Sequence, residues 1–388
     1  MLSMDSPFIY DRYVTGKHFV GRKDSCAILG NLLSNGEHVC IYSPPKTGKK
    51  SLIQQTLFNM RIGGTQFVVG EMNLVNVRHL TTFLIRYGAT ALRSVATTPA
   101  EYADLVQRFL GDTHFVFDRR RFAQSEEVVS LNWDPDEKDV SEMLRFPFRI
   151  ASDRGVKLIL ILNEFQNLDL TEDGDHLFKS LNCVMKEMRS SGNTSCSMLL
   201  CGSKVNAMKN IFEQRRRFHR QVERFDIPRV EPKDIVDSIT RGFLSSGKVV
   251  EKNLLLGMCN LFRCHLGYIY HFVSVCDSLT KGYITEAVMM DALRILVSIH
   301  EPRYVTMMDE LTTFQVNLLL AFVDGHTKFS SAEVIRDYGL HSSANVRRLK
   351  DALIKKEIVS LNENDEPQII DPLFDYWVRR YYFEKKPQ

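Results

Sequence analysis

The residues best suited to chemistry lie in one loop near the N-terminus, where a glycine and a lysine follow an apolar stretch. The apolar run 39–42 predicts a buried strand, and the residues from Thr47 to Met60 predict a helix. A loop between such a strand and helix presents backbone amides, a lysine and the positive end of the helix dipole to a phosphate group. We therefore expect these loop residues to bind the phosphates of a ligand: Pro44, Pro45, Lys46, Thr47, Gly48, Lys49, Lys50 and Ser51.

This loop matches the phosphate-binding pattern GxxxxGK[ST] only at its centre. Gly48 and Lys49 fit, but Ser43 stands at the first glycine and Lys50 stands at the hydroxyl position. In such sites that hydroxyl is a ligand of Mg²⁺. Three interpretations remain open: Lys50 replaces the hydroxyl, Ser51 supplies it after a local shift in register while Lys50 points to solvent, or the loop is a structural relic.

A second polar pair, Asn163 and Glu164, follows the apolar run 157–162. In phosphoryl-transfer sites an Asp at the first position holds Mg²⁺ and a Glu at the second orients water. Together Asn163 and Lys50 make the protein about two charges more positive where a dication would lie, so we expect no metal ligands here. Asn163 and Glu164 are the candidate catalytic residues, and hydrolysis is expected to be weak or absent, although Glu164 can still orient water.

The elements that must position these residues change in character along the chain. Short apolar runs alternate with amphipathic segments up to about residue 230, which is typical of a parallel sheet with crossover helices. From residue 231 to about 301 we expect helices without strands, followed by a connector over 302–310. The remainder predicts three helices and a hairpin, the order of a winged helix: 311–323, 331–338, 344–356, 358–362 and 368–370.

On these motifs the chain resembles the AAA-type ATPases of the bacterial and archaeal STAND-like group. The likeness covers nearly the whole chain and also rests on three further segments: Phe19-Val20-Gly21-Arg22, Leu199-Leu200-Cys201-Gly202-Ser203, and the stretch from Asp371 to Trp377. The resemblance implies an α/β fold, with a three-layer P-loop NTPase core, a helical lid and a C-terminal winged-helix domain. It implies domain boundaries at 1–230, 231–305 and 306–388.

The resemblance also implies a ligand and a function. ATP or ADP is the expected ligand, with Val20 and Arg22 on the base side and Ser203 at the end of the sensor 1 strand. Leu266 stands where the family has proline at the start of a lid helix. The implied function is a nucleotide-binding regulatory protein. The residues at the metal positions lead us to expect that it binds nucleotide without Mg²⁺, using Lys49 and Lys50. The alternatives are a non-enzymatic scaffold or DNA-binding protein on an inactive P-loop fold, and an active Mg²⁺-dependent ATPase.

Basic clusters suggest further contacts. The arginines at 215–217, with Arg220 and Arg224, either reach a γ-phosphate or form a solvated helix face. The third helix of the winged-helix module carries polar and basic residues suited to DNA, namely Asn345, Arg347, Arg348 and Lys350. The following hairpin is acidic at Glu363, Asp365 and Glu366. The segment 112–146 resembles an insertion, and its Trp133 suggests a surface for a protein partner.

Composition limits the broad class of protein. Fifty Lys and Arg residues against 47 Asp and Glu residues give a net charge of +3. The overall electrostatic field of the chain therefore does not favour a polyanionic partner. The eight cysteines form no CxxC pair, and we expect them to be reduced in a cytoplasmic protein. No run approaches the ~20 apolar residues of a membrane span, so no membrane partner is expected. Homo-oligomerisation remains open.

Overall fold

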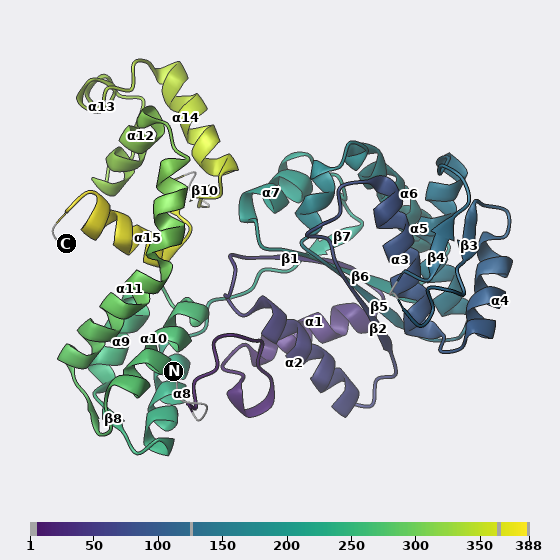
Figure 1. The fold of residues 1–388 in the computed structure, drawn as a ribbon, viewed down its shortest axis with the longest axis horizontal. Helices are drawn as coiled ribbons and strands as arrows, with labels where there is room; N and C mark the ends of the chain where they lie inside the picture. The colour runs from purple at the N-terminus through teal and green to yellow at the C-terminus, as the bar shows by residue number, and fades with distance from the viewer. Residues whose placement is uncertain (1–5, 125–126, 363–365, 386–388) are drawn as a thin grey trace. The chain divides into compact units, whose positions relative to one another are not determined.

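The computed structural model describes residues 6–124, 127–362 and 366–385 (Figure 1). The chain separates into two compact units. The first unit contains Met1–Arg22, Pro44–Gln54 and Pro228–Gln388, and the second contains Lys23–Ser43 and Gln55–Ile227. Each unit is described by itself.

The second unit is built on a sheet of five parallel strands in the order β2-β5-β6-β1-β7. The strands are β1 (His38–Tyr42), β2 (Val68–Asn73), β5 (Leu158–Asn163), β6 (Cys196–Gly202) and β7 (Val222–Arg224). Asn73 lies opposite Asn163, and Tyr42 lies opposite Gly202. Because all strands run the same way, the polar residues that follow β1, β5 and β6 lie along one edge of the sheet.

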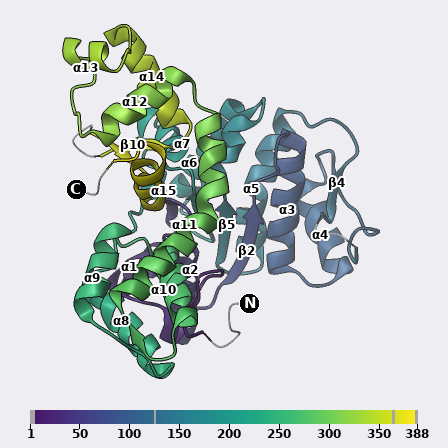
Figure 2. The same ribbon diagram turned by 60° about the vertical axis from the view of Figure 1, so that its left-hand side comes forward.

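Helices cover both faces of this sheet, which gives three layers (Figures 1 and 2). One face packs against α3 (Leu80–Val95), α5 (Glu137–Asp153) and α6 (Gly174–Ser190). The other face lies under α1 (Lys23–Ser34), where the Ser197 hydroxyl donates to the carbonyl of Leu33 at 3.0 Å. The helix α2 (Lys49–Ile62) begins directly after residues 43–48, which we call the phosphate loop after their predicted role. The predicted α/β fold with a three-layer core is confirmed.

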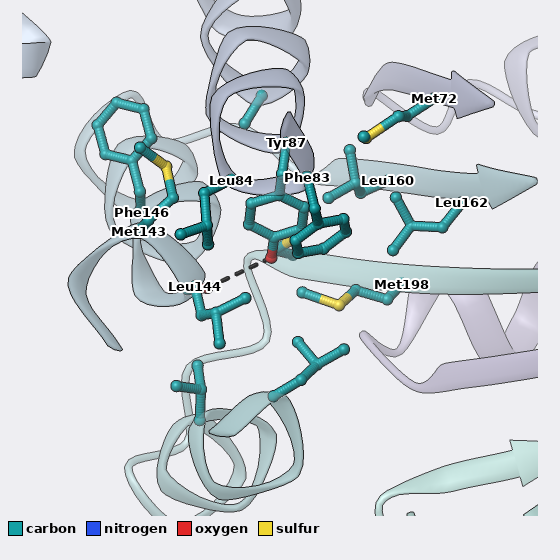
Figure 3. Packing of buried hydrophobic residues seen from close by; sticks show 14 of the residues in the cluster. Met72, Phe83, Leu84, Tyr87, Met143, Leu144, Phe146, Leu160, Leu162 and Met198 are labelled. Atoms are coloured by element: carbon teal, nitrogen blue, oxygen red, sulfur yellow. Dashed lines mark hydrogen bonds between the residues drawn. The ribbon is translucent and has the colours of Figure 1, made fainter. Parts of the chain in front are cut away.

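The alternation of side chains along the strands explains the two-sided packing. Leu160 and Leu162 point to one face, where Phe83 and Tyr87 of α3 fill the core (Figure 3). The Tyr87 hydroxyl is fully buried and donates to the carbonyl of Leu144 at 3.3 Å. This cluster buries large side chains from α3, α4, α5 and α6, and the burial of their apolar surface stabilises the second unit.

Further elements decorate the second unit. The segment 112–146, which resembled an insertion, forms an antiparallel hairpin of β3 (Phe115–Phe117) and β4 (Val129–Leu131) and the first part of α5. The helix α4 (Pro99–Leu110) precedes this segment. The short helical segments of this unit are η2 (Phe165–Leu170), α7 (Val205–Lys209) and the π-helical turn η3 (Asn210–Gln214).

The first unit contains a group of helices that follows the sheet in sequence. It comprises α8 (Pro232–Ser245), α9 (Lys252–Leu261), α10 (Leu266–Leu279) and the long helix α11 (Glu286–Asp309). The N-terminal segment, with η1 (Gly16–His18), belongs to this unit, and Phe8 packs edge-on against Phe243 of α8 at 4.7 Å between ring centroids.

The C-terminal module has winged-helix order. It contains α12 (Thr313–Val323), α13 (Ala332–Asp337), α14 (Ser343–Lys355), and a hairpin of β10 (Val359–Leu361) and β11 (Pro367–Ile369). It ends with α15 (Pro372–Trp377) and the π-helical turn η4 (Val378–Tyr382). Two of the acidic residues expected in this hairpin, Glu363 and Asp365, lie outside the described residues.

Two sequence-based expectations for the first unit are wrong. A short parallel pair, β8 (Val249–Val250) and β9 (Tyr283–Ile284), lies among helices where no strand was expected. The expected connector at 302–310 is helical, because α11 continues through Pro302. Pro302 removes one backbone donor, but Pro302 and Ser298 are both exposed, so water can satisfy the carbonyl that loses its partner.

Candidate functional site

The phosphate loop has a backbone that only particular residues can adopt. Gly48 has φ of 97°, and a Cβ atom at this position would lie 2.8 Å from Nη1 of Arg22. Lys46 also has a positive φ, of 60°. The Thr47 hydroxyl donates to the carbonyl of Pro44 at 2.9 Å and closes the loop on itself. Gly48 is therefore required both for its backbone conformation and for the close approach of Arg22.

Arg22 supports this loop from the side. Its Nη1 donates to the carbonyl of Thr47 at 3.0 Å, and its Nε donates to the carbonyl of Pro228 at 2.8 Å. Val20, the other residue expected on the base side, is half-buried and packs against the core of the first unit. Arg22 thus joins the phosphate loop to the chain that leads into α8.

The first turn of α2 contacts the N-terminal segment. The Ser51 hydroxyl accepts a hydrogen bond from the backbone amide of Val14 at 3.1 Å. The Lys50 ammonium lies 5.4 Å from the centroid of the Tyr13 ring, in a cation–π arrangement. Lys49 is partly buried at the start of the helix. Ser51 therefore takes part in anchoring the N-terminal segment.

The N-terminus of α10 binds the carbonyls of the phosphate loop. The backbone amide of Gly267 donates to the carbonyl of Lys46 at 3.0 Å, and Nε2 of His265 lies 2.9 Å from the carbonyl of Pro45. A Cβ atom on Gly267 would lie 2.5 Å from Cβ of Lys46, so the two backbones can approach this closely only with glycine at 267.

The contacts of His265 define its tautomer. Its Nδ1 caps α10 by accepting from the amide of Tyr268 at 3.3 Å, so Nε2 carries the proton that is donated to Pro45. Burial lowers the pKa of His265 and outweighs the opposing effect of the Asp371 carboxylate. A neutral His265 can therefore hold the helix cap and the phosphate loop together.

From α10, polar contacts continue into the winged-helix module. The Tyr268 hydroxyl donates to Oδ2 of Asp371 at 2.6 Å. The other oxygen of Asp371 caps α15 by accepting from the amides of Leu373 and Phe374 at 3.0 and 3.1 Å. The Asp371 carboxylate therefore connects α10 to α15.

Arg263 precedes α10 and reaches both the hairpin and the last helix of the module. Its Nη1 donates to the carbonyl of Ile369 at 2.9 Å, and its Nη2 forms an ion pair with Asp375. Arg263 and Cys264 both have positive φ values, of 49° and 58°. These contacts and those of Tyr268 form a continuous path from the phosphate loop to α15 within the first unit.

The second unit positions the polar pair that follows β5. Glu164 has a left-handed backbone with φ of 58°, and its Oε2 accepts from the hydroxyl of Ser203 at 2.6 Å and from Nε2 of Gln166 at 2.7 Å. The side-chain amide of Asn163 donates to Glu71 at 2.9 Å. The structure thus brings Glu164 and Ser203 together at one edge of the sheet.

Three of the arginines after α7 are paired with acids of the same unit. Arg215 forms ion pairs with Asp169 at 2.5 Å and Asp175 at 3.2 Å, and Arg217 pairs with Asp175 at 2.7 Å. Arg224 pairs with Glu213 and Asp226. These partners favour a structural role for the cluster in this conformation.

The residues proposed for DNA contact lie on α14. Arg347 and Arg348 are exposed, Lys350 is half-exposed, and none of them forms an ion pair with another described residue. Asn345 differs, because its Nδ2 donates to the carbonyl of Leu340 at 3.0 Å and so supports the start of the helix. The three cations are therefore available to an anionic partner in this conformation.

One group of potential metal ligands lies elsewhere in the second unit. Suitable atoms of His114, Asp136 and Asp139 lie within 4.8 Å of one another. Asp139 is buried, and its carboxylate accepts from the amides of His114 and Asp136, each at 2.8 Å, and from the His114 ring at 2.7 Å. These hydrogen bonds occupy the carboxylate, so the group fits a helix cap better than a metal site.

Sequence reasoning did not identify the roles of His265, Gly267 and Tyr268. Histidine is not among the residues that commonly cap helices, so no local signal marked His265 as the cap of α10. Its contact with Pro45, more than 200 residues earlier in the chain, has no local signature.

Comparisons with known proteins agree with this architecture. Residues 302–380 match a family model described as a probable winged helix domain. The structure is similar to the Walker-type ATPase of Pyrococcus abyssi, with a TM-score of 0.66 and 14% identity over 96% of this chain and 99% of that chain. It is also similar to the ORC2 protein of Aeropyrum pernix in its ADPNP-ADP complexes, with a TM-score of 0.57 and 13% identity over 94% and 93% of the two chains.

A search of proteins with curated functions found no significant match. The comparisons define the class of fold: this chain has the α/β fold of the AAA-type P-loop ATPases, with a C-terminal winged helix. Among the described helices, none combines the length and the apolar character that crossing a bilayer requires.

Proposed function

We propose that this chain is a nucleotide-binding regulatory protein that binds ATP or ADP and hydrolyses ATP weakly or not at all. The observation that carries the proposal is the phosphate loop, in which Gly48 adopts a glycine-specific backbone directly before Lys49 and the first turn of α2. Backbone amides and a lysine at a helix N-terminus suit the phosphates of a nucleotide. Arg22 and Thr47 hold this loop in shape.

The residues at the metal-ligand positions do not fit Mg²⁺. Lys50 brings a cation to the position of a hydroxyl ligand, and Asn163 brings a neutral amide to the position of a carboxylate. Ser51 is the alternative source of a hydroxyl, but it accepts a hydrogen bond from Val14. Without these ligands the charge of a transferring phosphoryl group loses its main stabilisation, which supports slow hydrolysis.

Each site residue has a proposed role. Lys49 and the loop amides bind the phosphates, Lys50 adds positive charge, and Val20 and Arg22 contribute to the base side. Glu164 is proposed to orient water, and Ser203 and Gln166 hold its carboxylate in place. The proposed domain boundaries are those of the sequence analysis, at residues 230 and 305.

The regulatory part of the proposal is supported by the path of contacts from the phosphate loop to the winged helix. A phosphate that changes the shape of the loop changes the positions of the Pro45 and Lys46 carbonyls, which bind His265 and Gly267. Tyr268 and Asp371 extend this path to α15. Such a shift of a packed element is a common means of coupling a ligand to a distant surface.

Binding of a fluorescent ADP analogue, followed by competition with ATP, tests the nucleotide site. Lys49→Ala is expected to weaken binding at least roughly tenfold, because it removes a charge-assisted hydrogen bond to phosphate. The control is Lys17→Ala, which removes an exposed cation of the same unit. Equal binding by both variants, or no binding by the unmodified chain, would favour a scaffold on an inactive fold.

DNA binding through α14 is a second candidate function. The observation that favours it is the set of exposed cations at Arg347 and Arg348, with Lys350 one turn along the same helix, none of which is paired with a described acid. Exposed cations on the third helix of a winged-helix module suit a phosphate backbone.

A further inference from the structure

Trp133 is exposed in a chain that buries its other tryptophan. Trp133 leaves 74% of its surface accessible, whereas Trp377 is 3% exposed and donates its indole N–H to Glu301 at 3.1 Å. An exposed tryptophan loses the favourable free energy that burial of its large ring would give. Tryptophan is also enriched among the residues that contribute most to the affinity of protein interfaces. Trp133 therefore has the character of an anchor for a partner.

The turn that carries Trp133 is fixed at its first end. We refer to residues 132–136, which join β4 to α5, as the Trp133 turn. The β3–β4 ladder pairs Phe115 with Leu131, and the amide of Asn132 then donates to the carbonyl of His114 at 3.0 Å. The backbone next to Trp133 is thereby held against the hairpin.

The second end of the Trp133 turn is fixed by a helix cap. The Asp136 carboxylate accepts from the amide of Asp139, and the Asp139 carboxylate accepts from the amide of Asp136, each at 2.8 Å. His114 closes the turn, because its amide and its Nδ1 lie 2.8 and 2.7 Å from the same Asp139 carboxylate. Since the backbone is already ordered on both sides of Trp133, a partner that covers it loses little further conformational entropy on binding.

The charge around the turn selects the kind of partner. Asp134, Asp136 and Glu137 are exposed, and Lys138 is the one exposed cation among residues 132–138 of the described chain. This excess of carboxylates repels the phosphates of nucleic acids and of anionic lipids. It attracts lysine and arginine side chains, which favours their approach in a defined orientation.

We propose that the Trp133 turn is a docking site for another protein, through a segment that carries lysine or arginine residues around an apolar pocket or side chain. The apolar group covers the indole ring, and the cations lie near Asp134, Asp136 and Glu137. This inference does not depend on nucleotide binding, because it rests only on residues of the second unit that lie outside the phosphate loop.

Selection from a random peptide display library on the full-length chain tests the proposal. Clones that also bind the Trp133→Ala variant are removed. The remaining peptides are expected to combine basic and apolar residues, and to bind Trp133→Ala at least roughly tenfold more weakly than the unmodified chain. Asp134→Lys is expected to weaken the binding of the same peptides, and the affinity of the peptides for the unmodified chain should fall with added salt.

The matched control is Tyr283→Ala, which removes an aromatic ring that is also 74% exposed but lies in the first unit. It should leave the affinity of the peptides unchanged, and thermal unfolding should show that each variant is folded. The proposal is overturned by an absence of Trp133-dependent peptides, or by a selection of acidic or uncharged ones. A change in oligomeric state caused by Trp133→Ala would also overturn it, since the occupant would then be a second copy of this chain.

Discussion

At the scale of single residues, the proposal of a metal-free site depends on two side chains. In the sequence motifs, Lys50 stands at the position of a hydroxyl ligand and Asn163 stands at the position of a carboxylate. Both changes act in the same direction, because each makes the position more positive. The remaining parts of the proposed site, including Gly48, Lys49 and Glu164, match the residue types of such proteins.

This pattern predicts that two substitutions restore a dependence on metal. The double variant Lys50→Thr with Asn163→Asp should hydrolyse ATP at least roughly tenfold faster with Mg²⁺ than with EDTA, because both ligand types are present again. Release of inorganic phosphate measures the rate, and each single variant serves as a control. A folded double variant that binds nucleotide but shows no metal-dependent rate would contradict this explanation and show that other residues prevent hydrolysis.

Alanine substitutions at two glycines separate the effect of a close backbone contact from the effect of alanine on helix stability. Gly267→Ala should weaken nucleotide binding, because its Cβ atom would lie 2.5 Å from Cβ of Lys46 and displace the phosphate loop. The control is Gly257→Ala, because Gly257 is exposed in the middle of α9 and no atom lies within 4 Å of the added Cβ atom. It should stabilise the chain by about 0.5–1 kcal/mol and leave binding unchanged. Titration with labelled ADP and thermal unfolding measure the two effects, and an unaltered affinity in Gly267→Ala would contradict the proposed role of this contact.

At the scale of elements, the buried histidine of β1 links the stability of the sheet to pH. Burial, assisted by Arg189, lowers the pKa of His38 to about 4, and its Nδ1 accepts from the amide of Met198 at 3.1 Å. Neutral His38 stabilises the fold above the unfolded-state pKa of about 6.5, and this contribution is lost as the pH falls toward 4.

We expect the free energy of unfolding to fall by about 2 kcal/mol from pH 7 to pH 5 through His38 alone. The reason is that the unfolded chain binds a proton at this histidine more readily than the folded chain does. Urea unfolding at both pH values measures the change. His38→Gln should show a correspondingly smaller loss, even if it is less stable at pH 7. An identical pH dependence in the two proteins would show that His38 remains neutral in both states or is protonated in both.

The elements that sequence reasoning identified are those with strong local patterns. The strand β5 is apolar up to Asn163 and β6 is predominantly apolar, and α14 of the winged-helix module has clear apolar spacing. The pair β8 and β9 was missed because two-residue strands have no periodicity. The continuation of α11 through Pro302 depends on solvent exposure, which a local pattern does not encode.

At the scale of the whole molecule, His265, Tyr268 and Asp371 connect the phosphate loop to α10 and to the winged helix within the first unit. The sequence motifs predict that Gly48, Lys49, Asn163 and Glu164 are site residues, and this remains a prediction. They did not locate the contact of His265 with Pro45, because the two residues approach each other only in the folded chain. Long-range contacts of this kind are decided by tertiary packing, so single-sequence patterns carry little information about them.

The winged helix should bind duplex DNA in a manner that depends on salt. Arg347→Ala combined with Arg348→Ala should weaken binding and reduce the slope of log K against log salt by roughly 0.9 for each phosphate contact that is lost. Fluorescence anisotropy of a labelled duplex measures both quantities. Arg294→Ala, which removes an exposed arginine of α11 that is 67% accessible, is the control. If both proteins lose affinity equally, the contact is not specific to α14.

The measurement that tests the central claim most directly is calorimetric titration of ATP and ADP into the purified chain, first in EDTA and then in excess Mg²⁺. A site in which Lys49 and Lys50 supply the positive charge should bind nucleotide in EDTA with an affinity that Mg²⁺ does not raise. Binding that requires Mg²⁺, or an absence of binding in both buffers, would contradict the account of a nucleotide site that functions without a metal ion.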